Sequence, residues 1–286
     1  MTDYKVDFDE YLNDFIDRCI REDVGDGDHT SLSCIPAEAT GRARLLVKED
    51  GILAGVDVAR KIFAHLDKEF KFNQLLKDGD RVKKGDVAFT VEGRTQTLLL
   101  AERLVLNVMQ HMSGIATMTS RYVDKLKGLK TQVIDTRKTT PGMRLLDKMA
   151  VKIGGGGNHR IGLFDMILLK DNHVDFAGGI DKAIMRAHDY LKAKGKSLKI
   201  EIEVRNMDEL EQVMQIGGVD RIMLDNFSLE QTRKAVERIG GKYETESSGG
   251  ITMDTLRDYA ECGVDFISVG ALTHHVGNLD LSLKAF

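Results

Sequence analysis

The spacing of hydrophobic residues near the start of the chain predicts an amphipathic helix. Apolar side chains recur every three or four positions from Phe8 to Ile20, with acidic residues between them. Alternation of apolar and polar residues then predicts strands over residues 43–47 and 87–91, with a helix over residues 56–66 between them. A longer helical pattern occupies residues 95–126. The first part of the sequence therefore favours an α+β domain.

The pattern changes at about residue 130, where short apolar runs begin to alternate with helical stretches. Seven runs are expected to be strands, at residues 132–135, 151–153, 165–169, 199–204, 221–224, 243–246 and 266–269. Helices are expected between most of them, over residues 179–193, 208–215, 229–239 and 253–262. Repeated strand–helix units predict a parallel sheet that is buried on both faces. Seven such units favour an irregular closed barrel over an open sheet.

Composition limits the partners more than the fold. The 286 residues contain 41 basic and 45 acidic side chains, a net charge of −4. Such a chain has no general attraction for nucleic acid or an anionic membrane, so an anion site must be a local concentration of cations. The widely separated Cys19, Cys34 and Cys262 indicate reduced thiols in a cytoplasmic protein. We expect neither a signal peptide nor a membrane-spanning segment.

Chemically useful side chains follow the expected strands, at the end where barrel enzymes carry their active sites. Potential cations follow the first three strands: Arg137, Lys138, His159, Arg160 and Lys170. Carboxylates end the next two strands: Glu203 and Asp225. Glycine turns follow the last two strands: Ser248-Gly249-Gly250 and Gly270-Ala271.

The mixture of these groups indicates the kind of ligand. Clustered cations repel one another unless a polyanion neutralises them. Arginine can bind a carboxylate or phosphate through two hydrogen bonds, lysine acts as a mobile point charge, and the N–H groups of glycine turns can hold a phosphate. The residues therefore suit a sugar phosphate with a metal-bound pyrophosphate, together with an anionic acceptor.

Several of these residues also have ordinary structural interpretations. Taken alone, Arg137 and Lys138 would more often be a solvated pair, and His159 a structural histidine. Glu201 shares a strand face with Glu203 and either lines the barrel or pairs with a cation. Neither His173 nor His274 is assigned a role beyond structure. The shared position of the other residues at strand ends is what favours a site.

Eight short motifs stand in order along nearly the whole chain. They are Glu-Arg-Leu-Val-Leu-Asn at 102–107, Thr-Arg-Lys-Thr-Thr-Pro-Gly at 136–142, Gly-Gly-Gly-Asn-His-Arg at 155–160, Leu-Lys-Asp-Asn-His at 169–173, Glu-Ile-Glu-Val at 201–204, Leu-Asp-Asn at 224–226, Ser-Gly-Gly-Ile at 248–251 and Gly-Ala-Leu-Thr at 270–273. Together they resemble the quinolinate phosphoribosyltransferase family (nicotinate-nucleotide pyrophosphorylase, carboxylating). One departure is a spacing between Glu203 and Asp225 that looks one residue longer than expected.

The resemblance implies an α/β fold in two domains. An open-faced α/β sandwich would occupy residues 1–113, and an irregular, TIM-like, seven-stranded α/β barrel would occupy residues 114–274. The tail at residues 275–286 would pack back on the sandwich. The resemblance also implies a homodimer in which each subunit lends Arg103 to its neighbour's site.

The same resemblance implies an activity and a role for each site residue. A phosphoribosyl group would pass from phosphoribosyl pyrophosphate to quinolinate with loss of carbon dioxide, giving nicotinate mononucleotide for NAD biosynthesis. The residues expected to bind quinolinate are Arg103, Arg137, His159 and Arg160. Those expected to bind phosphoribosyl pyrophosphate are Lys138, Lys170, Glu203, Asp225, Ser248, Gly249, Gly250, Gly270 and Ala271.

The chemistry itself is expected from four of these residues: Lys138, Lys170, Glu203 and Asp225. Mg²⁺ is the expected cofactor, held by Glu203 and Asp225 directly or through water. Two alternatives stay open: a related phosphoribosyltransferase that acts on another small acid, and a sugar-phosphate-binding module without turnover.

Overall fold

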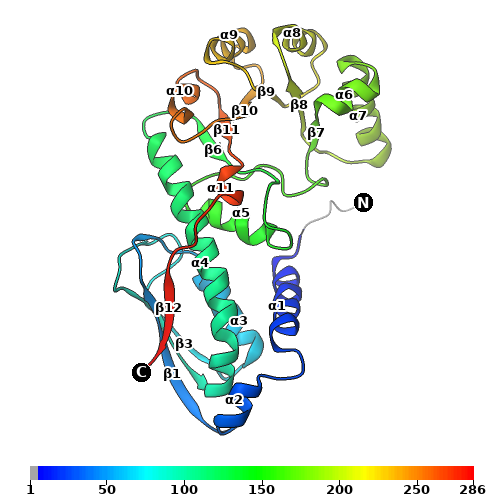
Figure 1. Cartoon of the computed structure of the whole chain (residues 1–286). Helices are drawn as coiled ribbons and strands as arrows, with labels where there is room; N and C mark the ends of the chain where they lie inside the picture. The colour runs from blue at the N-terminus through cyan, green and yellow to red at the C-terminus, as the bar shows by residue number, and fades with distance from the viewer. Residues whose placement is uncertain (1–5) are drawn as a thin grey trace. The chain divides into compact units, whose positions relative to one another are not determined.

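The computed structural model describes residues 6–286 and divides into two compact units (Figure 1). Residues 6–120, 140–155 and 272–286 form what we call the sandwich unit, and residues 121–139 and 156–271 form the barrel unit. Helix α4 (Thr95–Lys125) runs from the first unit into the second, so the domain boundary expected after residue 113 falls inside a helix. The first five residues of the expected sandwich lie outside the described residues.

The sandwich unit is built on a four-stranded antiparallel sheet in the order β12-β1-β5-β3. Its strands are β1 (Thr40–Val47), β3 (Lys71–Gln74), β5 (Val87–Arg94) and β12 (Leu281–Ala285), and a separate pair is formed by β2 (Gly51–Ile52) and β4 (Arg81–Val82). Leu45 of β1 pairs with Phe89 of β5 on one side and with Leu283 of β12 on the other. The end of the chain therefore completes the sheet that the beginning of the chain starts.

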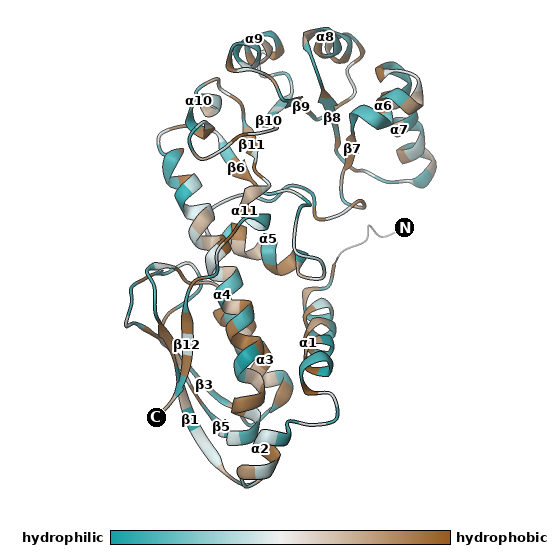
Figure 2. Cartoon of the chain, in the orientation of Figure 1, coloured by the Kyte–Doolittle hydropathy of each residue, from teal (hydrophilic) through white to brown (hydrophobic). Residues whose placement is uncertain are grey.

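Helices cover this sheet with apolar side chains. Phe63 of α3 (Val56–Leu66) meets the Phe89 ring of β5 edge-on at 6.4 Å and stacks on Phe70 at 4.4 Å. Figure 2 shows hydrophobic stretches along α3 and α4. Among residues 6–286, no helix is both long enough and apolar enough to cross a membrane.

The expected first helix is confirmed as α1 (Phe8–Val24), followed by the short α2 (His29–Cys34). The Asp7 carboxylate caps α1 by accepting the N–H groups of Asp9 and Glu10, which would otherwise lack partners in the first turn. Leu12, Phe15 and Ile16 are its buried residues. The helix thus buries the apolar face that the sequence pattern indicated.

The barrel unit contains six hydrogen-bonded parallel strands in the order β6-β11-β10-β9-β8-β7. They are β6 (Gln132–Ile134), β7 (Ile167–Leu169), β8 (Ile200–Val204), β9 (Arg221–Asp225), β10 (Glu244–Ser248) and β11 (Phe266–Ser268). The helices α6 (Asp171–Ala177), α7 (Ile180–Lys194), α8 (Met207–Ile216), α9 (Leu229–Ile239) and α10 (Leu256–Ala260) lie on the outer side of the strands (Figure 1). The expected α/β fold, with a parallel sheet in its second part, is confirmed.

The strand expected at residues 151–153 is wrong. These residues end α5 (Arg144–Ile153), in which Leu146, Ala150 and Val151 are buried at helical spacing. An apolar run of three residues is too short to distinguish a strand from a helix. The sheet therefore has six strands instead of the seven expected, and Gly157 forms a single parallel bridge with Ile134 at its β6 edge. A Cβ atom at residue 157 would lie only 2.8 Å from Ile134 Cγ2, so glycine permits this close approach.

Gly114 gives a test of packing in the sandwich unit. Alanine usually stabilises a helix by about 1 kcal/mol relative to glycine. Here a Cβ atom would lie 2.2 Å from the Gly277 carbonyl oxygen. We therefore expect Gly114→Ala to lower the free energy of unfolding by roughly 1–3 kcal/mol, measured by urea denaturation. Gly277→Ala is the control because its Cβ would meet nothing within 4 Å; a Gly114→Ala protein as stable as wild type would contradict this packing.

Candidate functional site

Asp135 fixes the loop that carries the first predicted site residues. Its buried carboxylate follows β6, and its Oδ1 accepts the N–H of His159 at 2.9 Å. Its Oδ2 accepts from Asn158 Nδ2 at 2.6 Å. The sequence pattern placed Asp135 at the end of a strand and gave no sign of this role, because the partner segment lies more than twenty residues away. Asp135 therefore holds residues 158–160 beside the end of β6.

Two arginines lie close together at this end of the strands. The exposed Arg137 follows Asp135 by two residues, and the half-buried Arg160 donates from Nη1 to the Met166 carbonyl oxygen at 3.1 Å. The pKa of Arg160 is lowered because burial disfavours its charge and, next, because Arg137 is nearby. The proximity of two arginine side chains favours a bound anion.

Carboxylates end the neighbouring strands. Lys170 Nζ lies 3.7 Å from Glu203 Oε2, whose side chain is 11% exposed. Burial raises the pKa of Glu203, Lys170 opposes that shift, and the nearby Asp225 adds to it. The structure thus brings Lys170, Glu203 and Asp225 together, and this is the arrangement expected from their positions after consecutive strands.

The first glycine turn packs directly against the end of β9. Asn226 adopts a left-handed backbone with φ 54°, and its N–H donates to the Ser248 carbonyl oxygen at 2.9 Å. Its side-chain Nδ2 donates to Asp225 Oδ2 at 2.7 Å. Gly249, with φ 96°, leaves room for this side chain, since a Cβ there would lie 2.2 Å from Asn226 Oδ1. Asn226, held by the turn at residues 248–250, therefore orients the Asp225 carboxylate.

The remaining predicted residues are placed as follows. Lys138 is exposed in the loop after β6. Gly270 and Ala271 lead from β11 into the short α11 (Ala271–His274). Arg103 is exposed on α4 in the sandwich unit. His173, which was assigned no role beyond structure, caps α6, because its Nδ1 accepts the Lys170 N–H at 3.0 Å.

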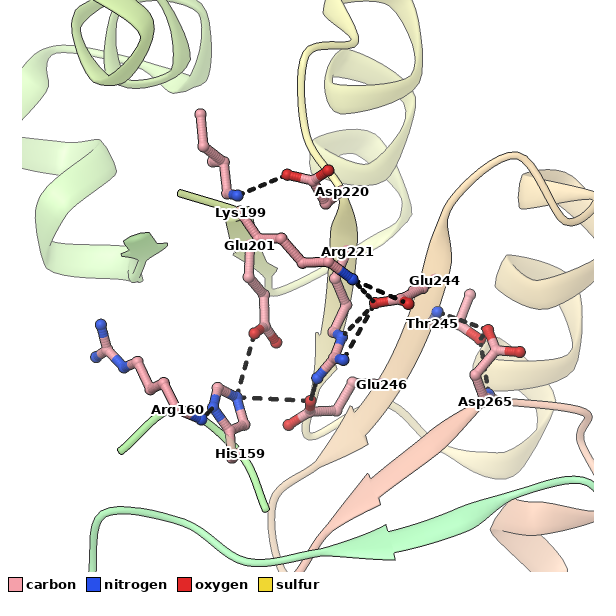
Figure 3. Close-up of polar contacts among 11 residues, drawn as sticks. His159, Arg160, Lys199, Glu201, Asp220, Arg221, Glu244, Thr245, Glu246 and Asp265 are labelled. Carbon is pink, nitrogen blue, oxygen red and sulfur yellow. Dashed lines mark hydrogen bonds and ion pairs between the residues drawn. The ribbon is translucent and has the colours of Figure 1, made fainter. Parts of the chain in front are cut away.

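Below these residues, His159 faces two glutamates inside the barrel (Figure 3). Its Nε2 lies 3.1 Å from Glu201 Oε2 and 3.6 Å from Glu246 Oε2. Both carboxylates have no exposed surface, and His159 is 8% exposed. Burial raises the pKa of each glutamate to about 7. Glu201 therefore lines the barrel interior, one of the two roles left open for it.

Arg221 continues this chain of charges toward the opposite ends of the strands. Its Nη1 donates to Glu246 Oε2 at 3.0 Å, and its Nη2 donates to Glu244 Oε2 at 3.1 Å (Figure 3). Lys199 Nζ lies 3.3 Å from Glu244 Oε1. The alternation of Glu244 and Glu246 along β10 was a sequence signal for this inward face, and it was missed.

Two sets of residues could hold a cation. Among residues 6–286, the one group of three potential ligand atoms within 4.8 Å of one another is that of His159, Glu201 and Glu246. Glu246 is already hydrogen-bonded to Arg221, whose positive charge opposes a second cation. Glu203 and Asp225 are a pair of oxygen donors beside the cationic loops, and Mg²⁺ commonly uses one or two carboxylates together with substrate phosphates. The residues present therefore fit Mg²⁺ better at Glu203 and Asp225.

The two parts of the chain match the two parts of one family. Residues 28–113 match the family profile for the quinolinate phosphoribosyl transferase N-terminal domain, and residues 115–284 match that for its C-terminal domain. The chain belongs to the quinolinate phosphoribosyltransferase family. Within that family, it is similar to the chloroplastic nicotinate-nucleotide pyrophosphorylase (carboxylating) of Arabidopsis thaliana. The two sequences are 44% identical over 288 residues, and the matched region covers 96% of this chain and 82% of the Arabidopsis protein.

Bacterial relatives are similar along nearly their whole length. The probable nicotinate-nucleotide pyrophosphorylase (carboxylating) of Bacillus subtilis is 40% identical over 272 residues, covering 95% of this chain and 92% of that one. The crystal structure of NadC from Streptococcus pyogenes matches with a TM-score of 0.91 at 38% identity, over 99% of this chain and 100% of that one. The nicotinate-nucleotide pyrophosphorylase from Francisella tularensis matches with a TM-score of 0.90 at 40% identity, over 100% of both chains.

The raised pKa of Glu246 predicts a pH dependence of stability in this family member. A carboxyl group whose pKa is higher in the folded protein stabilises it fully below the ordinary value of 4.5, and this contribution is lost as pH rises through about 7. We expect the free energy of unfolding to fall between about pH 5 and pH 8, and to fall less in Glu246→Gln, because an amide does not titrate.

Urea denaturation at several pH values measures this difference in slope. Glu237→Gln, at an exposed position of α9, is the control and should keep the wild-type slope. A Glu246→Gln protein with the wild-type slope would show that Glu246 ionises normally in the folded barrel.

Proposed function

We propose that this chain transfers the phosphoribosyl group of phosphoribosyl pyrophosphate to quinolinate, releasing pyrophosphate and carbon dioxide and giving nicotinate mononucleotide for NAD biosynthesis. One observation carries the proposal beyond family membership: the paired arginines Arg137 and Arg160 lie at the same ends of the strands as Lys170, Glu203 and Asp225. The cationic half of the site, which contains Arg137 and Arg160, suits a dicarboxylate. The acidic half, which contains Glu203 and Asp225, suits a ribose that develops positive charge.

Quinolinate is bound by the cationic half. Its two carboxylates lie on one edge of a rigid ring, and the forked donors of Arg137 and Arg160 match them with two hydrogen bonds each. Arg103, exposed on α4, is lent by the neighbouring subunit of a homodimer. His159 was expected to bind quinolinate as well, and it supports this half from inside the barrel. The clamp aims the ring nitrogen at the anomeric carbon, so catalysis rests mainly on positioning.

Phosphoribosyl pyrophosphate is bound by the acidic half and the glycine turns. Glu203 and Asp225 hold either the ribose hydroxyls or the water molecules of a bound metal ion, and their negative charge favours the oxocarbenium-like centre that forms as pyrophosphate leaves. The N–H groups of residues 248–250 and of Gly270 and Ala271 hold the 5′-phosphate. Lys138 and Lys170 stabilise the charge of the departing pyrophosphate.

Glu203 and Asp225 would hold Mg²⁺, the cofactor proposed for this step, directly or through water. When bound, it neutralises part of the charge on the pyrophosphate. Asp225 is a suitable donor because the Asn226 side chain already holds its carboxylate, with Nδ2 2.7 Å from Oδ2.

Decarboxylation follows from the product of the transfer. Once the ring nitrogen is bonded to ribose it carries a positive charge, which stabilises the carbanion left at the adjacent carbon when carbon dioxide leaves. That carbon then takes up a proton. The step needs no general base, in keeping with a site that is rich in cations.

We place this enzyme in the cytoplasm as a homodimer. The three cysteines are free, which fits a reducing compartment. The exposed position of Arg103 on α4 leaves it accessible to a second subunit.

A steady-state assay with phosphoribosyl pyrophosphate, Mg²⁺ and either quinolinate or nicotinate tests the reaction. We expect nucleotide formation with quinolinate alone, with one carbon dioxide released for each nucleotide. Turnover with nicotinate would instead indicate a related phosphoribosyltransferase for another small acid. Binding of phosphoribosyl pyrophosphate without any turnover would indicate a sugar-phosphate-binding module.

Arg137→Ala tests the clamp. Losing a charged hydrogen-bonding partner should weaken quinolinate binding by about 1.5–3 kcal/mol, measured as the Kd by calorimetry. Arg233→Ala removes an exposed arginine from the outer helix α9 and is the matched control. Normal quinolinate affinity in Arg137→Ala would rule out the assignment of Arg137 to the clamp.

A further inference from the structure

Both ring nitrogens of His159 are directed at neighbours within the barrel. Nδ1 accepts the N–H of Arg160 at 2.7 Å, and Nε2 lies 3.1 Å from Glu201 and 3.6 Å from Glu246 (Figure 3). The main-chain N–H of His159 is held as well, by Asp135 at 2.9 Å. The imidazole therefore connects the backbone of Arg160 to the two buried glutamates.

These contacts determine where the ring carries its proton. A main-chain N–H can only donate, so Nδ1 must present its lone pair to Arg160. The ring proton then lies on Nε2, the nitrogen that faces the carboxylates. The opposite tautomer would set two N–H groups against each other at Arg160, where the two nitrogens are 2.7 Å apart. Carboxylates that fix the tautomer of a histidine in this way also orient what the histidine holds.

We propose that Glu201 and Glu246 are positioning residues, which hold His159 in the Nε2–H tautomer and thereby place the backbone of Arg160 for binding quinolinate. This inference rests on the proposed function, since it needs Arg160 to be a quinolinate ligand. It gives a function to two carboxylates with no exposed surface that contact neither substrate in the proposed reaction. Removing Glu201 should disturb one substrate and spare the other, because Lys170, Asp225 and the glycine turns are held separately.

The arrangement also accounts for the charge of Arg160. Glu201 raises the pKa of that arginine, opposing the effects of burial and of Arg137. Glu246, in turn, accepts a hydrogen bond from Arg221 at 3.0 Å, so this neighbour of His159 is itself held in place. The Arg160 side chain points away from the two glutamates (Figure 3), and its Nη1 donates to the Met166 carbonyl oxygen, so its other N–H groups are the ones available to an anion.

The first test is a spectrum of the wild-type protein. Long-range ¹H–¹⁵N correlation on histidine-labelled full-length protein, assigned by comparison with His159→Asn, reports which ring nitrogen carries the proton. We expect His159 to be neutral with its proton on Nε2. A proton on Nδ1, or on both nitrogens, would overturn the proposal without any assay of turnover.

The second test separates positioning from folding. Glu201→Leu removes the carboxylate that lies 3.1 Å from Nε2, and it should mix the tautomers of His159 and raise the KM for quinolinate on the order of ten-fold, the effect of losing one charged contact. The KM for phosphoribosyl pyrophosphate should change by less than about two-fold. Glu201→Gln keeps an acceptor oxygen and should restore most of the quinolinate KM. Glu237→Leu, at an exposed position of α9, is the control.

Three results would overturn the proposal. Equal increases of both KM values in Glu201→Leu would indicate a merely structural glutamate. An unchanged quinolinate KM would show that His159 needs no such support. One equivalent of a divalent metal in the purified wild-type protein, lost in Glu201→Gln, would mean that the three side chains bind metal instead. If the wild-type protein does not turn over quinolinate, the proposed function is wrong. The spectra still show which tautomer His159 adopts and whether that tautomer depends on Glu201.

Discussion

The ion pair of Arg221 inside the barrel is the interaction on which the site depends. Glu201 and Glu246 have no exposed surface, and burying a carboxylate without compensation costs several kcal/mol. Arg221 donates to Glu246 and to Glu244, and its guanidinium carbon lies 4.0 Å from the centre of the Phe266 ring. One cation thus stabilises a group of acids that would otherwise make the interior of the sheet unstable.

The cationic part of the site, Arg137 and Arg160, lies next to these buried glutamates. Glu201 contacts His159, His159 holds the N–H of Arg160, and Asp135 fixes both His159 and Asn158. Buried carboxylates therefore lie beside the arginine loop, and Glu201 raises the pKa of Arg160. This explains how a chain of net charge −4 can gather arginines at one end of its strands.

Much of this arrangement could be predicted from the sequence, and the parts that could not share a physical cause. The polar residues after each apolar run gave the positions of Arg137, Lys170, Glu203 and Asp225, because parallel strands bring their carboxyl ends to one edge. The run at residues 151–153 was misassigned because three apolar residues fit a helix as well as a strand. The roles assigned to these residues came from resemblance to a family, and the geometry here shows their placement alone.

Contacts that depend on the register between strands could not be predicted from the sequence. Arg221 lies level with Glu201 on one side and Glu244 on the other only because β9 pairs in one particular register with β8 and β10. The sequence of one strand does not by itself show which residues of a neighbouring parallel strand will lie opposite it. The bridge at Gly157 and the anchoring of His159 by Asp135 were hidden for the same reason, since both join segments more than twenty residues apart.

A crystal structure of the protein with quinolinate bound would test the central claim most directly. The account predicts that the two carboxylates of the ligand contact the guanidinium groups of Arg137 and Arg160, with the ring nitrogen facing the side of Glu203 and Asp225. Quinolinate bound instead in the polar pocket at the opposite ends of the strands, lined by Lys199, Lys242 and Glu244, would contradict it.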